Sequence, residues 1–250
     1  MKFTIRPIKT GVVLPPQDDL LERIRRSKLT LKEGDIVAVT SKVVGIWEGQ
    51  TLPIDSISKD ELIKKESKLW LPRENVWGRR VMHTITQGIL IASAGIDESN
   101  GNGWYILWPR DPQKSAEKLL RFFKKEYGVK KIGVIITDSH STPLRRGVSG
   151  FALSYAGFQP LIDYRGKKDI FGHGFHFSQV NIPDALASIA TLAMGEGDEQ
   201  QPLAVISGTP YVFRKASRTK RIFSDFDVDL KQDLYGAFLN SVPWRKGKGK

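Results

Sequence analysis

The sequence contains no cysteine among its 250 residues. Without thiols, the chain forms neither disulfides nor thiolate metal sites, and a cysteine nucleophile is excluded. Any metal ion must therefore be bound by oxygen atoms or imidazole nitrogens. The absence of disulfides also suits a reducing compartment, so we expect a cytoplasmic protein.

Long apolar runs and the two commonest nucleotide-binding signatures are also absent. The first residues, MKFTIRPIKTGVVLPP, carry alternating polar side chains where a secretion signal needs an apolar core. No later run approaches the length that spans a membrane, so we expect no membrane partner. Neither a GxGxxG fingerprint nor a P-loop lysine motif occurs at a strand-to-helix turn. Any nucleotide is then bound in a less common way.

Basic residues outnumber acidic ones, 39 to 27, which gives a net charge of +12 and a pI of about 9.8. This charge fits nucleic acid as a partner, but it fits phosphorylated or polycarboxylate ligands equally well. Much of the excess lies in Arg214 to Arg221 and in the final WRKGKGK, neither of which has apolar periodicity. Such runs are typical of solvated segments and a flexible end, and we expect no nucleic-acid partner.

Apolar periodicity predicts a mixed α/β fold without internal repeats or a linker. Apolar and β-branched runs predict strands over residues 2–13, 35–44, 87–93, 131–137 and 202–207. Helical spacing, with start and stop signals, predicts helices over residues 18–34, 59–69, 111–127 and 182–194. The run from Lys131 to Thr137 is almost wholly apolar, as in a strand buried on both faces, and it leads directly into Asp138.

Two aspartates, Asp97 and Asp138, follow apolar strand-like segments and lie among small polar residues, in GIDESN and ITDSHSTPLRRG. Carboxylate oxygens are ligands that Mg²⁺ and Mn²⁺ prefer, and hydroxyl and phosphate oxygens complete the coordination. Two such loops that converge would form one metal site. The alternative is that each aspartate only starts a turn or caps the next element, as aspartate often does.

Arg145 and Arg146 follow Asp138 closely and offer bidentate donors for phosphate or carboxylate groups. The alternative for both is an ordinary salt bridge. The segment DYRGKKDIFG, from Asp163 to Gly172, carries more charge than an ordinary loop requires, which is a second signal of function.

The histidines do not match the spacing of zinc ligands. We interpret His140, His173 and His176 as surface or core residues. His140 stands apart from the other two because it lies beside Asp138 in the sequence.

An ordered set of motifs resembles one known family, the ligases that add L-glutamate to coenzyme F420-0, a deazaflavin hydride carrier. The motifs are GDIVAVTSKVV, the pair Glu48-Gly49, AGIDESN, the helix start DP..SA, VIITDS, RRG, AGF.PL.DYRGK.D.FG and A..A.LAMGEG..Q.PLAVI. They occur in order from about residue 3 to residue 208. Each motif alone is weak, but the ordered set is highly specific.

The resemblance implies a mixed α/β fold peculiar to this family and an intertwined homodimer. It also implies a γ-glutamyl ligase domain over residues 1–208, of one or two subdomains, and a basic C-terminal extension over residues 209–250. A nucleoside triphosphate, GTP or ATP, would phosphorylate the acceptor carboxylate, and L-glutamate would displace the phosphate. Two divalent cations, Mg²⁺ or Mn²⁺, would neutralise the charge on the transferred phosphoryl group.

The family's site residues carry over onto positions that match its motifs. Asp97 and Asp138 match metal-binding aspartates, and Ser139 stands where a metal-binding threonine is usual. Together with Arg145 and Arg146, the two aspartates form the expected catalytic set. The expected nucleotide contacts are Leu14, Pro15, Ser41, Lys42 and Asn100, with Met194, Gly195, Glu196, Glu199 and Gln200 in a loop that closes over the nucleotide.

The chain departs from the family pattern at three places. The residues from Ser139 to Thr142 replace a turn that usually contains threonine, glycine and arginine. Ile46 stands where a phosphate-binding lysine is expected, and the turn at Pro15-Pro16 is shorter. Recognition of the acceptor or of the nucleotide is therefore expected to differ from that of the family.

The segments SHSTPLRRG and WYILWPRDP resemble a bacterial subgroup associated with folate metabolism. Trp104, Tyr105 and Trp108 would then stack on a pterin, unless they belong to the core. Our leading interpretation is the addition of L-glutamate to a folate, as in tetrahydrofolate polyglutamylation, with coenzyme F420-0 as the alternative acceptor. The alternative of another class is an inactive, basic nucleic-acid-binding relative, which would have no reason to keep Asp97 and Asp138.

Overall fold

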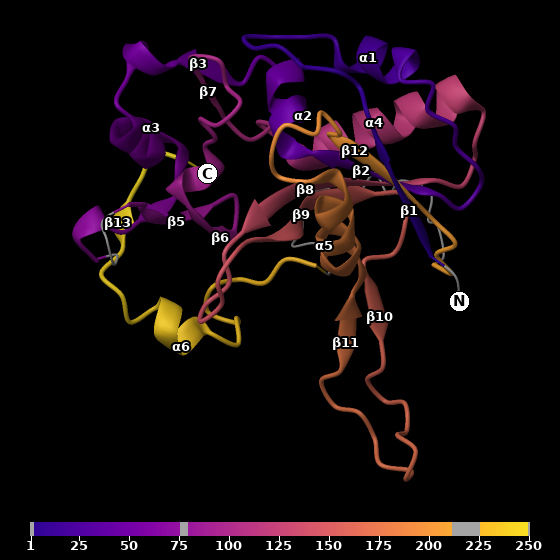
Figure 1. The fold of residues 1–250 in the computed structure, drawn as a ribbon. Helices are drawn as coiled ribbons and strands as arrows, with labels where there is room; N and C mark the ends of the chain where they lie inside the picture. The colour runs from indigo at the N-terminus through magenta and orange to yellow at the C-terminus, as the bar shows by residue number, and fades with distance from the viewer. Residues whose placement is uncertain (1–2, 76–79, 212–225, 250) are drawn as a thin grey trace. The chain divides into compact units, whose positions relative to one another are not determined.

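The computed structural model describes residues 3–75, 80–211 and 226–249. The chain divides into two compact units, each assembled from segments that are distant in the sequence (Figure 1). Unit 1 contains Met1–Val13, Asp19–Val44 and Asp111–Phe226, and unit 2 contains Leu14–Asp18, Gly45–Arg110 and Asp227–Lys250. The predicted basic segment from Arg214 to Arg221 lies entirely outside the described residues.

Unit 1 is built on a five-stranded sheet with the order β1 (Thr4–Ile8), β12 (Leu203–Ser207), β2 (Ile36–Thr40), β8 (Gly133–His140) and β9 (Ser149–Ala156). The pair β2–β8 is parallel and the other pairs are antiparallel. Apolar side chains of the three central strands are almost fully buried, as the continuous apolar run of β8 predicts. The predicted mixed α/β fold is therefore confirmed.

Two helices cover the sheet of unit 1. α5 (Ile182–Met194) packs its buried face, which includes Leu186 and Ala190, onto β9 and its neighbours. α4 (Pro112–Tyr127) packs against β8 and β9, where the Ser154 hydroxyl donates a hydrogen bond of 2.8 Å to the carbonyl oxygen of Pro112. The side chains of Asp111 and Asn181 cap the two helices, and both predicted helices are confirmed.

Other boundaries in unit 1 differ from the prediction. β1 ends at Ile8, so the predicted strand over residues 9–13 is wrong. The strand predicted over residues 35–44 ends at Thr40, and the next residues begin α2 (Ser41–Trp47). Val43 and Val44 are buried in that helix, because burial outweighs the preference of valine for strands. α1 (Leu20–Arg26) is also shorter than predicted, since its last turn ends at Ser27.

A narrow ribbon projects from unit 1 (Figure 1). It consists of β10 (Leu161–Asp163) and β11 (Gln179–Asn181), which pair antiparallel, and of the connection between them. We call residues 161–181 the arm. Ile170, Phe171 and Phe177 in the arm are 90%, 78% and 91% exposed. The arm thus exposes apolar surface that the described part of its own unit does not cover. An isolated two-stranded ribbon is only marginally stable by itself.

Unit 2 contains a four-stranded sheet in the order β13 (Arg245–Lys246), β4 (Leu69–Trp70), β5 (His83–Thr86) and β6 (Ile89–Ala92). A second pair joins β3 (Thr51–Pro53) to β7 (Trp104–Ile106). The described helices are α3 (Lys59–Glu66) and the short α6 (Gly236–Leu239), with single 3₁₀ turns at Ile54–Ser56, Arg73–Asn75 and Ser93–Gly95. The helix predicted over residues 59–69 is confirmed as α3, but it ends at Glu66 because Leu69 already belongs to β4. The strand predicted from Gln87 starts at Ile89 instead, because Gln87 and Gly88 have positive φ and form the β5–β6 turn.

The end of the chain is part of unit 2. Arg245 and Lys246 pair with Trp70 and Leu69, so β13 forms an edge of the sheet. The prediction of a flexible end is therefore wrong for these two residues, although their side chains are exposed to solvent as predicted. No helix in the described part of the chain is both long enough and apolar enough to cross a membrane.

Gly150 allows α5 to lie directly on β9. A Cβ atom at this position would lie 2.6 Å from the carbonyl oxygen of Ala187 and would overlap the hydroxyl of Thr191. We expect Gly150→Ala to lower the free energy of unfolding by about 1–3 kcal/mol, because the helix must move away from the strand. Urea unfolding measures the change. Gly174→Ala is the matched control, since a Cβ there meets nothing within 4 Å; equal stability of the two variants would contradict the packing argument.

Candidate active site

In unit 1, the candidate site begins where the two parallel strands end. Thr40 and Thr137 are paired across β2 and β8, so the residues that follow them lie at the same edge of the sheet. Ser41 and Lys42 start α2 on one side, and Asp138 continues β8 on the other. The carboxyl ends of parallel strands are where α/β proteins commonly bind ligands. The fold therefore brings two predicted nucleotide contacts and one predicted metal ligand to one edge.

Asp138 and Ser139 are held in defined positions at this edge. The Asp138 Oδ1 atom accepts a hydrogen bond of 2.7 Å from the backbone N–H of Ser139. Ser139 pairs with Gly150 of β9, and its Oγ lies 3.4 Å from Glu196 Oε2. The contact joins the predicted metal-binding strand end to the loop after α5, 57 residues further along the chain. No pattern in the sequence predicts this contact.

The loop from Met194 to Gln201 returns to the same edge. Gly195, with φ of 83°, ends α5, and its N–H donates to the carbonyl oxygen of Thr191 at 3.0 Å. The Glu199 carboxylate accepts a hydrogen bond of 2.8 Å from the N–H of Gly197 and stabilises the turn. Gln200 then accepts from the N–H of Thr10, at 3.2 Å. Unit 1 thus brings the predicted nucleotide loop, Ser139 and Asp138 together.

The chemistry of these groups fits a hard divalent cation. Asp138, Ser139 and Glu196 provide only oxygen atoms, the donors that Mg²⁺ and Mn²⁺ prefer. Within residues 3–75, 80–211 and 226–249, no group of three or more His, Asp or Glu side chains is placed to hold a metal ion. Mg²⁺ is commonly bound by one or two carboxylates together with substrate phosphates, so a nucleotide would complete the coordination.

Arg145 and Arg146 lie in the exposed connection between β8 and β9. The N–H of Arg145 donates to the carbonyl oxygen of Thr142 at 3.3 Å, and the intervening Leu144 is 99% exposed. Neither guanidinium forms an ion pair with a carboxylate of the described residues, so the salt-bridge alternative finds no support there. Both side chains are available to an anionic ligand.

His140 follows Ser139 on β8 and packs against an aromatic ring. Its imidazole centroid lies 4.8 Å from that of Phe151. Burial lowers the pKa of the His140 imidazole below its ordinary value, which favours the neutral form of the ring. The interpretation of His140 as a packed residue therefore holds. His173 and His176 are both in the arm, and neither belongs to a metal cluster of the described residues.

In unit 2, Asp97 and Asn100 lie in the connection between the turn Ser93–Gly95 and β7. Asp97 and Ile106 exchange two backbone hydrogen bonds of 2.9 Å, which fixes the position of the aspartate. Asn100 has φ of 55°, a conformation that asparagine tolerates better than most residues. Beside it, the Glu98 carboxylate pairs with Lys59 at 3.0 Å. Asp97 is thus presented by an ordered loop, as a metal ligand requires.

The predicted turn at Leu14 and Pro15 also belongs to unit 2. The N–H of Leu14 donates to the Asp18 carboxylate at 2.8 Å, and the carbonyl oxygen of Pro16 accepts from the Thr51 hydroxyl at 2.8 Å. Ile46, at the position of the expected lysine, is 2% exposed. A buried isoleucine has no donor for phosphate, so the phosphate contact that the resemblance implies at this position has no donor here.

The aromatic segment near β7 is mainly core. Tyr105 and Trp108 are each 5% exposed, and only Trp104 is partly exposed. The alternative that these aromatic residues belong to the core is therefore confirmed for Tyr105 and Trp108, whose rings are not exposed to stack on a pterin. A Cβ on Gly95 would overlap the Trp108 ring, which shows how closely the backbone packs there.

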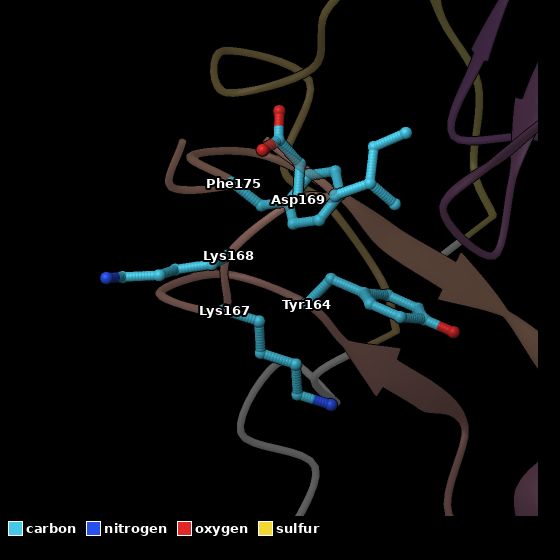
Figure 2. Close-up of a pocket in the computed structure, with 6 residues that line it drawn as sticks. Tyr164, Lys167, Lys168, Asp169 and Phe175 are labelled. Carbon is cyan, nitrogen blue, oxygen red and sulfur yellow. The ribbon is translucent and has the colours of Figure 1, made fainter. Parts of the chain in front are cut away.

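The charged segment from Asp163 to Gly172 forms the arm's turns. The Arg165 guanidinium beside Asp163, at 2.6 Å, holds the pKa of that carboxyl down to about 2. Asp169 Oδ1 accepts backbone hydrogen bonds of 2.8 Å from Phe171 and His173. Much of the charge therefore stabilises local structure. The segment also lines most of a pocket of about 470 Å³, formed by Tyr164, Lys167, Lys168, Asp169, Ile170 and Phe175 (Figure 2).

Comparison with known proteins gives one consistent result. The model of the family described as F420-0:Gamma-glutamyl ligase matches residues 7–208. A protein of Methanopyrus kandleri is 35% identical over 222 residues, which cover 82% of this chain and 86% of the relative. A protein of Methanocaldococcus jannaschii is 36% identical and covers 77% and 84% of the two chains, and one of Archaeoglobus fulgidus is 32% identical and covers 83% and 88%.

All three relatives bear the name coenzyme F420:L-glutamate ligase. The matched region includes the strand ends, the loop after α5 and the segment around Asp97. These similarities support a γ-glutamyl ligase and favour an F420-type acceptor over the folate that we put first. The chain belongs to the F420-0:γ-glutamyl ligase family and is an amide-forming glutamate ligase.

Proposed function

We propose that this ligase joins the amino group of L-glutamate to a carboxylate of coenzyme F420-0, with GTP or ATP as the phosphoryl donor. The observation that carries the proposal is the match of residues 7–208 to the family model, together with relatives named for this acceptor. A folate acceptor has weaker support, because two of the three aromatic residues expected to stack on a pterin are buried.

The reaction has two steps. A carboxylate oxygen of the acceptor attacks the terminal phosphorus of the nucleotide, and the bond to the nucleoside diphosphate breaks. The amino group of L-glutamate then attacks the acyl carbon, inorganic phosphate leaves, and the nitrogen loses a proton. The first step concentrates negative charge on the phosphoryl group, so its barrier depends on positive groups placed around the transferred phosphate.

Asp138, Ser139 and Glu196 are the unit 1 residues that would hold a divalent cation, and we assign Asp97 the same role in unit 2. Two such ions, Mg²⁺ or Mn²⁺, would supply positive charge to the phosphates. The exposed guanidinium groups of Arg145 and Arg146 are suited to bind anionic oxygens of the substrates. This assignment is supported by the Ser139–Glu196 contact and by the oxygen-only donor set.

The nucleotide is assigned to the residues that follow β2 and α5. Ser41 and Lys42 provide a hydroxyl and an ammonium group at the start of α2, and the loop from Met194 to Gln200 provides backbone donors and the Glu199 carboxylate. In unit 2, Leu14, Pro15 and Asn100 are the nucleotide contacts that the family resemblance implies. Because the loop is tied to Thr10 through Gln200, its closure over a nucleotide would move the residues between Gly195 and Glu199 most.

A direct assay distinguishes the two acceptors. We expect purified protein supplied with L-glutamate, Mg²⁺ or Mn²⁺ and a nucleotide to add the mass of one glutamyl residue to coenzyme F420-0, detected by mass spectrometry. Tetrahydrofolate treated in parallel should keep its mass. GTP and ATP are compared in separate reactions, and a reaction without nucleotide is the control. Glutamylation of tetrahydrofolate alone would overturn the proposed acceptor, while leaving the ligase assignment intact.

We also propose that the ligase acts as a homodimer. The family resemblance implies one, and the arm exposes three large apolar side chains that the described part of unit 1 does not cover. Apolar side chains on a projecting ribbon become buried when two copies exchange such ribbons. The arm is therefore the element that we assign to the contact between copies.

A further inference from the structure

The last described residues of the chain follow the edge of unit 2 closely. β13 pairs with β4, and the hydrogen bonds continue beyond it: the N–H of Gly247 donates to Lys68 O at 3.0 Å, Lys248 to Lys64 O at 3.0 Å, and Gly249 to Ser67 O at 2.9 Å. These bonds also use carbonyl groups at the end of α3, which a helix leaves without partners. Residues 245–249 are thus fixed by backbone contacts.

The alternation of lysine and glycine follows from this packing. A Cβ on Gly247 would overlap the carbonyl oxygen of Ser67, and one on Gly249 would overlap that of Glu66. Glycine is required wherever two backbones approach so closely. Arg245, Lys246 and Lys248 carry their charges on exposed side chains instead. The KGKG segment is therefore a packed backbone that presents cations, and not a flexible linker.

Further cations lie at the same edge. The Lys64 ammonium and the Arg245 guanidinium lie 5.0 Å and 5.2 Å from the centroid of the Trp70 ring, which restrains both. The Trp70 indole N–H donates to Lys246 O at 3.3 Å, so the ring itself is held. Lys68 directly precedes β4 and its side chain is exposed. We call the five residues the cationic edge: Lys64, Lys68, Arg245, Lys246 and Lys248.

The cationic edge lacks ion-pair partners among the described residues, although the Lys64 ammonium acts electrostatically on the nearby Asp60 carboxylate. None of its five residues forms an ion pair with a carboxylate of the described residues. The nearby Asp60 carboxylate is bound instead by the Arg73 guanidinium, which is the main reason that the pKa of Asp60 is lowered. Like charges held close together repel one another, and an anionic partner that spans them relieves the repulsion.

From this geometry we propose that the cationic edge binds the phosphate backbone of single-stranded nucleic acid, as a second activity separate from glutamate ligation. A row of exposed cations along a strand edge suits an extended chain of phosphates. Lysine contacts phosphate as a point charge without reading bases, so the binding is independent of base sequence and weakens with salt. Three of the five cations, Arg245, Lys246 and Lys248, also lie outside residues 7–208, which the ligase family model matches.

The test measures binding of a labelled oligothymidylate of about 20 nucleotides as salt is raised. With five phosphate contacts, the logarithm of the binding constant should fall with that of the salt concentration with a slope of about −3.5. The triple variant Lys68→Gln, Lys246→Gln and Lys248→Gln should bind at least about 10-fold more weakly at low salt, with a slope of about −1.4. Its backbone contacts remain, since only side chains change.

A matched control removes the same net charge elsewhere. Lys32, Lys125 and Lys130 are exposed residues of unit 1, and their replacement by glutamine should leave oligonucleotide binding within about 2-fold of the wild type. Ligase activity should persist in both variants. The oligonucleotide assay does not depend on the acceptor, so an error in the proposed acceptor would not change its outcome. No binding by the wild type at low salt, equal losses in the two variants, or equally tight binding of poly-L-glutamate would each overturn the proposal.

Discussion

Replacing Asp138 with alanine is expected to abolish glutamate ligation while the chain remains folded. The Asp138 carboxylate lies at the end of β8, beside Ser139 and the loop that carries Glu196. If it holds a divalent cation against the nucleotide, its loss removes positive charge from the transferred phosphate, and turnover should fall more than about 100-fold. The measurement is the rate of glutamyl addition at saturating nucleotide and metal.

The cost in stability should be small by comparison. Asp138 Oδ1 accepts a hydrogen bond from the N–H of Ser139, and such a bond contributes about 1 kcal/mol. Asp55→Ala, an exposed carboxylate in the turn Ile54–Ser56, is the matched control and should retain full turnover. Titration calorimetry measures the binding of Mn²⁺ and nucleotide directly, and so separates lost coordination from lost folding. Near wild-type turnover in Asp138→Ala would refute the assigned metal role.

Replacing Ile170, Phe171 and Phe177 together with serine is expected to convert a dimer into monomers. These side chains are 90%, 78% and 91% exposed on the arm, so their loss removes little packing within one chain. If the arms of two copies cover one another, burial of three large apolar groups is lost, at roughly 1.5–3 kcal/mol each. Analytical ultracentrifugation should show the mass falling from twice 28.1 kDa to 28.1 kDa.

Leu192→Ser provides the control for the arm, because Leu192 is 85% exposed on α5 and lies outside the arm. This variant should keep the mass of the wild type. Two outcomes speak against the proposed contact: a wild-type protein that is already monomeric at micromolar concentration, or a triple variant that remains dimeric.

Periodicity predicted the elements whose burial is continuous. Sequence patterns predict the apolar run of β8 and the amphipathic α4 and α5, because each element packs against much the same neighbours along its whole length. Residues 41–44 were predicted as strand because Val43 and Val44 are β-branched. They form the start of α2 instead, where both side chains are buried, so tertiary packing decided the conformation. The local sequence around residues 41–44 carries no information about that packing.

The site was predictable only in part for the same reason. Asp138 could be recognised because it follows a buried strand directly, which is a local pattern. The contact between Ser139 and Glu196 depends on α5 lying on β9, which in turn depends on Gly150. The packed lysine–glycine end was misread as flexible, because composition alone does not reveal that Gly247 and Gly249 face a backbone.

The interleaving of the two units has a consequence for synthesis on the ribosome. β1 is made first, but its sheet partner β12 begins at Leu203, and β2 also waits for β12 and β8. In unit 2, β4 waits for β13 at Arg245 to cover its free edge. Neither unit can therefore close its sheet while most of the chain is still being made. The nascent chain exposes open strand edges until late, so its yield in cells should depend on chaperones more than its size suggests.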